Sequence, residues 1–106
     1  MSGQKPKVIA LEGNEKFQRL LAGAPETAGM KSGHVVLQPG ESVGEHNTEA
    51  KEEAIIVLEG TAQVFIAGAV FCLVAGKQLI YIPPHTPHDI KNISDGPLRY
   101  VYVVKS

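Results

Sequence analysis

The feature that most constrains the fold of this chain is a regular series of short, strand-like runs separated by turn residues. Between residues 34 and 104, runs rich in β-branched and aromatic residues alternate with breaks such as Pro39-Gly40 and Glu59-Gly60. β-Branched and aromatic residues favour extended backbone, and glycine and proline favour tight turns. Short strands spaced in this way indicate an all-β sandwich or barrel. The runs cover residues 34–38, 53–58, 62–66, 70–74, 79–82, 88–91 and 99–104.

The N-terminal third has a different pattern. Asn14 is a suitable helix cap, Phe17, Leu20 and Leu21 would share one helical face, and Gly23 could end the last turn. We therefore expect a short helix over residues 14–23 and a connecting loop over 24–33. A chain of 106 residues has the length of one domain. We divide it into an N-terminal segment, 1–33, which packs on a barrel formed by 34–106.

Two of the predicted strands, 54–58 and 100–104, are apolar on both faces, where burial of one face alone would give alternation. Their outer faces must be covered, either by the N-terminal segment or by a second subunit. Because exposed apolar patches of this kind usually mark interfaces, we expect a homodimer formed by sheet-to-sheet contact.

Composition bounds the partners and the compartment. A formal net charge of -1 with 43% hydrophobic residues excludes a strongly basic face for nucleic acid or for an anionic membrane. The apolar stretch after Lys5 and Lys7 is too short for a signal-peptide core, and the apolar window 64–75 is too short to span a bilayer. The single Cys72 cannot form an intrachain disulfide. We expect a cytoplasmic protein whose partners are neither nucleic acids nor membranes.

Three side chains that can ligate a metal lie near the ends of the predicted strands: His46, Glu53 and His88. Neutral imidazole and carboxylate suit divalent iron, manganese, nickel or zinc. Two histidines and one carboxylate can occupy one face of an octahedron and leave positions open for substrate or oxygen. The residue types therefore permit a metal site, although composition alone does not bring these side chains together.

The same residues belong to two motifs that resemble those of the cupin family. The segment Gly40-x5-His46-x-Thr48-x4-Glu53-x6-Gly60 is similar to the first cupin motif, and Gly76-x6-Pro83-x-His85-x2-His88-x3-Asn92 is similar to the second. The resemblance implies a small single-domain cupin of the conserved-barrel (cupin 2) type, with a double-stranded β-helix, the cupin jelly-roll barrel. It also implies that His46, Glu53 and His88 are metal ligands inside the barrel.

The chain departs from the family pattern at one ligand position. Thr48 stands where the first motif usually has its second histidine, and a hydroxyl is a poor ligand for these metals. The implied ligand set shrinks to two histidines and one glutamate. His85 could enter the pocket as a substitute ligand or as a general base, and we assign it the candidate catalytic role. Glu52 competes with Glu53 for the carboxylate position, and only the spacing to Gly60 favours Glu53.

The resemblance leaves the activity open, because cupins include oxygenases, isomerases, decarboxylases, storage proteins and ligand-sensing domains. One hypothesis is a metal-dependent enzyme, such as an oxygenase or isomerase, that acts on a small organic molecule. The alternative is a non-catalytic ligand-binding or regulatory cupin without an obligatory metal. Both need an apolar pocket, for which alternating strand positions predict Val36, Ile55, Val57, Phe65, Tyr81 and Tyr102 as lining residues.

Overall fold

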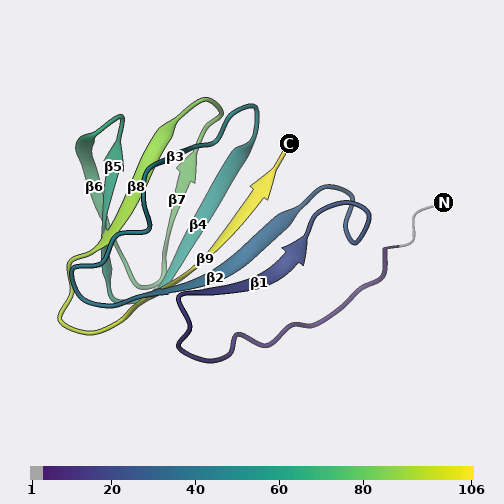
Figure 1. Ribbon diagram of the computed structural model, residues 1–106, viewed down its shortest axis with the longest axis horizontal. Helices are drawn as coiled ribbons and strands as arrows, with labels where there is room; N and C mark the ends of the chain where they lie inside the picture. Colours follow the sequence, from purple (N-terminus) through teal and green to yellow (C-terminus); the bar gives the residue numbers. More distant parts are fainter. Residues whose placement is uncertain (1–3) are drawn as a thin grey trace.

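The computed structural model of the chain describes residues 4–106 and forms two antiparallel β-sheets that face one another (Figure 1). The first sheet has the strand order β1-β2-β9-β4-β7, and the second has the order β3-β8-β5-β6. This all-β arrangement confirms the predicted barrel. The strands are β1 (Phe17–Ala22), β2 (Lys31–Leu37), β3 (His46–Asn47), β4 (Glu52–Glu59), β5 (Thr61–Ile66), β6 (Ala69–Ala75), β7 (Gln78–Ile82), β8 (Pro87–Asn92) and β9 (Leu98–Lys105).

The core lies between the two sheets and is made by the inward positions of alternating strands. On β4 the alternation is direct, since Glu53, Ile55 and Val57 are buried while the residues between them are half-buried or exposed. The buried polar or charged residues are Ser32, His34, Thr48, Glu53, His88 and Asn92, and the rest of the core is mainly aliphatic. The buried hydrophobic residues are Val35, Val36, Leu37, Ile55, Val57, Ala62, Val64, Val74, Ile80, Ile82, Ile90, Leu98 and Tyr100.

The predicted N-terminal helix is wrong, because residues 17–22 form strand β1 and no helix is found in residues 4–106. β1 pairs antiparallel with β2, and the register shifts between Arg19 and Leu21. A bulge of this kind inserts one residue into a strand. The insertion interrupts the alternation of Phe17, Leu20 and Leu21 and leaves a spacing that imitates one face of a helix. β2 also begins at Lys31, earlier than the predicted strand.

The N-terminal segment, residues 4–16, runs past the β1 edge of the first sheet (Figure 1). The Gln18 side chain donates a hydrogen bond to the Ala10 carbonyl, and Arg99 on β9 donates one to the Gly13 carbonyl. Strands β6 and β7, each at the end of its sheet, carry exposed apolar side chains, among them Phe71 and Leu79. In the part of the chain that the structure describes, no helix could cross a membrane.

Candidate metal centre

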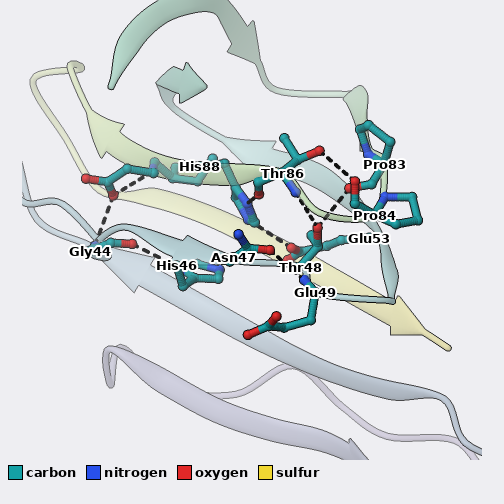
Figure 2. Close-up of polar contacts among 12 residues, drawn as sticks. Gly44, His46, Asn47, Thr48, Glu49, Glu53, Pro83, Pro84, Thr86 and His88 are labelled. Atoms are coloured by element: carbon teal, nitrogen blue, oxygen red, sulfur yellow. Dashed lines mark hydrogen bonds and ion pairs between the residues drawn. The ribbon is translucent and has the colours of Figure 1, made fainter. Parts of the chain in front are cut away.

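His46, Glu53 and His88 come from three strands and converge between the two sheets (Figure 2). His46 on β3 lies directly opposite His88 on β8 in the strand register, and Glu53 projects from β4 of the other sheet. One ligand atom from each of the three side chains lies within 4.8 Å of the other two. The structure thus brings together the three residues that the motifs implied, and the spacing suits a single metal ion.

Both histidines are oriented by backbone carbonyls. The Nδ1 atom of His46 lies 3.1 Å from the Gly44 oxygen, and that of His88 lies 3.0 Å from the Thr86 oxygen. A carbonyl only accepts hydrogen bonds, so each Nδ1 must carry the proton in the neutral ring. Each Nε2 then presents a lone pair. A hydrogen bond from the second ring nitrogen to a carbonyl is the arrangement that orients histidines for metal binding.

The Nε2 atom of His88 has no aligned hydrogen-bond partner, although it is fully buried. The Oε1 atom of Glu53 lies only 2.9 Å away, and the Glu53 side chain is also nearly buried. A buried polar atom without a partner is costly. A cation between Nε2 and the carboxylate would satisfy both groups, so the donor set fits a divalent metal.

When no metal is bound, a proton on the His88 ring can supply part of the positive charge beside Glu53. Burial lowers the pKa of His88, but the Glu53 carboxylate, the Thr86 carbonyl and the charge of Asp89 together outweigh burial. The pKa of His88 therefore lies above the ordinary imidazole value. A raised pKa means that a positive charge at this ring is favoured beside Glu53.

The carboxylate position belongs to Glu53, and Glu52 points elsewhere. Glu52 is exposed and accepts a hydrogen bond of 2.7 Å from the Tyr81 hydroxyl. Adjacent residues of a strand face opposite sides of a sheet, so only one of the two carboxylates can enter the barrel. Of the two carboxylates, Glu53 is therefore the one grouped with His46 and His88.

Thr48 is buried and makes two hydrogen bonds to the β7–β8 turn (Figure 2). Its hydroxyl donates to the Pro83 carbonyl at 2.8 Å and accepts from the Thr86 N–H at 3.0 Å. The carbonyl of Thr86 in turn accepts from Nδ1 of His88. Where the motif usually has a histidine, this chain has a residue whose hydroxyl bonds to the turn that precedes His88.

His85 lies in the same turn but does not join the triad. Its side chain is exposed, its φ of 57° is in the left-handed region, and its N–H donates to the Glu49 carbonyl at 2.6 Å. It is not among the residues that line the cavity around the triad. A catalytic role for His85 stays a prediction.

A cavity of about 370 Å³ surrounds the triad. Of the predicted lining residues, Ile55 and Tyr102 line it, whereas Tyr81 is exposed on the outside. Two aromatic residues were missed. Tyr100 lies two positions before Tyr102 on β9, so the alternation that indicated Tyr102 could also have found it. Phe17 was assigned to the helix, and no local signal placed it at the cavity.

Comparisons with known proteins agree with the fold. Residues 33–104 match the family described as the cupin domain. Over 112 residues the chain is 32% identical to "Polyketide synthase CurC" of Streptomyces cyaneus, in a match that covers 96% of this chain and 71% of that protein.

Two solved structures illustrate the shared fold. A cupin 2 conserved barrel domain protein from Salinispora arenicola has a TM-score of 0.77 and 23% identity, with coverage of 96% of this chain and 90% of that one. The cupin domain of an XRE family transcriptional regulator from Enterobacter cloacae has a TM-score of 0.74 and 20% identity, with coverage of 85% and 94%. At these identities the likeness concerns the fold alone.

Proposed function

The chain belongs to the cupin family, and from this premise we propose that it is a metal-dependent enzyme. In this proposal His46, Glu53 and His88 hold one divalent transition metal, which is iron, manganese, nickel or zinc. A small organic molecule binds in the cavity beside it and is the substrate of an oxygenase or isomerase reaction. The relative named polyketide synthase CurC supports an oxygenated small molecule as substrate.

The observation that carries the proposal is the buried, unpartnered Nε2 of His88 beside the Glu53 carboxylate. Both histidines are held by backbone carbonyls through Nδ1, which leaves Nε2 as the atom that would bind an ion. A bound divalent metal supplies a Lewis acid with positions left open for substrate or oxygen.

The remaining residues of the cavity bind and shield the substrate. Aliphatic side chains, including Val43, Ile55 and Ile90, line most of the wall and limit the access of water. Burial first, and the charge of Glu53 second, raise the pKa of Tyr100 and of Tyr102. Both hydroxyls therefore keep their protons at neutral pH and can donate hydrogen bonds to an oxygen of the substrate.

Elemental analysis of protein purified without a polyhistidine tag tests the metal centre. We expect close to one equivalent of a transition metal in the wild-type protein and a loss of most of it in His88→Ala. His34→Gln is the matched control, because His34 is buried against Gln18 and does not line the cavity. A folded wild-type protein that retains no more metal than His88→Ala would refute the proposal.

A second candidate function is a ligand-binding or regulatory cupin without turnover. The observation that favours it is Thr48, which leaves the family's usual fourth ligand out and is engaged in the turn. A cupin domain of similar fold occurs in a transcriptional regulator. Saturable binding of a small molecule without turnover, even in protein loaded with metal, would support this candidate over the enzyme.

We further propose a homodimer and a cytoplasmic location, as the sequence led us to expect. The half-buried outer residues Ile56 on β4 and Val101 on β9 support an additional contact on that face. Light scattering at micromolar concentration tests the dimer, and a stable monomer would refute it.

A further inference from the structure

Two aromatic rings form one wall of the cavity, and one of them comes from outside the region that matches the family. Phe17 lies on β1, upstream of residues 33–104, and Tyr102 lies on β9. Their ring centroids are 6.3 Å apart, and the ring planes are inclined by only 20°. Both rings line the cavity, and Phe17 is 47% exposed. An exposed aromatic ring at a cavity wall offers a surface on which a ligand can pack.

Gly33 on β2 makes room for this pair of rings. It lies opposite Tyr102 in the strand register. A Cβ atom at this position would lie 2.6 Å from Cε2 of Tyr102 and 2.8 Å from Cε1 of Phe17. Contacts of that length are not tolerated, so any other residue would displace both rings. The wall therefore depends on three residues that the metal centre does not require.

The cavity is lined by both apolar and polar residues. The Phe17–Tyr102 wall and the aliphatic residues, such as Val43 and Ile90, form an apolar surface. The polar lining includes Glu53 and the residues Tyr100 and Tyr102, and no hydrogen bond of either tyrosine hydroxyl is found within residues 4–106. Unused donors near an apolar wall fit a ligand with a flat apolar part and an oxygen at one end.

We propose that the cavity binds a planar, conjugated molecule that bears oxygen, such as a phenol, an enol or an aromatic ketone. Its ring packs on Phe17 and Tyr102, and its oxygen is directed to the tyrosine hydroxyls and the His46–Glu53–His88 centre. The inference deepens the proposed function and rests on it for the oxygen end of the ligand. The ring end rests on the aromatic wall alone.

Calorimetric titration of the full chain with 2-naphthol and with decahydro-2-naphthol tests this inference. The two probes share a hydroxyl and a two-ring skeleton, but only the first is flat and aromatic. A merely hydrophobic cavity would bind the saturated probe at least as tightly. We expect zinc-loaded protein to bind 2-naphthol more tightly, and Phe17→Leu to weaken this binding by about 3- to 10-fold, as expected for the loss of one aromatic contact. Binding of the saturated probe should change by less than about 2-fold.

Phe71→Leu is the matched control, because Phe71 is an exposed phenylalanine on β6 that does not line the cavity. It should bind both probes like the wild type. Gly33→Ala is a second test, and we expect it to weaken 2-naphthol binding through displacement of both rings. Equal binding of the two probes, or unchanged 2-naphthol binding in Phe17→Leu, would overturn the inference.

Elemental analysis of the purified protein, combined with the same titration in EDTA-treated protein, separates this inference from the proposed function. If purified protein holds no metal while 2-naphthol binding still depends on Phe17, the metal-dependent enzyme is refuted and the aromatic wall is supported. If metal is present and Phe17→Leu has no effect, the metal centre stands and the aromatic wall is refuted.

Discussion

Replacing Thr48 with valine would remove one hydroxyl and almost nothing else, because the two side chains have nearly the same shape. The lost interactions are the hydrogen bond donated to the Pro83 carbonyl and the one accepted from the Thr86 N–H. Both lie in the β7–β8 turn, and the Thr86 carbonyl orients the His88 ring. The substitution should therefore affect stability and metal binding together.

The magnitude follows from the burial of the partners. Pro83 is exposed, so water can replace the hydroxyl at its carbonyl, and that loss should cost about 1 kcal/mol. Thr86 is half-buried, and its N–H would lose its partner, which should cost about 1–2 kcal/mol. We expect the free energy of unfolding to fall by about 2–3 kcal/mol. Loss of a group that orients a ligand histidine typically lowers metal affinity by about 10- to 100-fold.

Urea unfolding of EDTA-treated protein, followed by circular dichroism, measures the first effect, and zinc titration against a chromogenic chelator measures the second. Thr61→Val is the matched control, because no hydrogen bond of the Thr61 hydroxyl is found within residues 4–106. Its free energy of unfolding should stay within about 0.5 kcal/mol of the wild type. If Thr48→Val behaves like this control in both assays, the assignment of Thr48 to the positioning of His88 is wrong.

Two further predictions concern His85 and the buried Tyr100. We expect His85→Ala to keep its metal, since the side chain is exposed and outside the cavity, whereas metal loss in elemental analysis would place His85 among the ligands. Because the folded state raises the pKa of Tyr100, the stability that its proton provides is complete below about pH 10 and is lost as pH rises through the folded value. In EDTA-treated protein, the free energy of unfolding should therefore fall above pH 10, less so in Tyr100→Phe. An unchanged decline in that variant would contradict this assignment.

The barrel could be predicted because its strands carry local signals. The β5–β6 hairpin is an example, since the break at Ala67-Gly68 in the sequence corresponds to a turn in which both residues have positive φ, 51° and 83°. Such values match the two-residue turns that best join antiparallel strands. β1 could not be predicted in this way, because its bulge is set by pairing with β2 and breaks the local period.

Part of the candidate site could likewise be predicted from the sequence, and part could not. The convergence of His46, Glu53 and His88 followed from the resemblance of two motifs, and the structure brings the three residues together. The engagement of Thr48 depends on how the β7–β8 turn returns to it across 35 residues of sequence, which no local pattern reports. The outward direction of His85 likewise follows from the backbone of that turn.

The shortness of β3 has a consequence for the order in which the site opens. His46 is exposed and sits on a strand of two residues, held by two register pairs to β8, whereas Glu53 and His88 are buried on longer strands. Segments with few buried contacts open at low free energy without unfolding the rest of the protein. We expect amide hydrogen exchange to be faster at 46–47 than at 53–57. If the three side chains hold a metal, His46 would be the ligand carried by the segment that opens most easily.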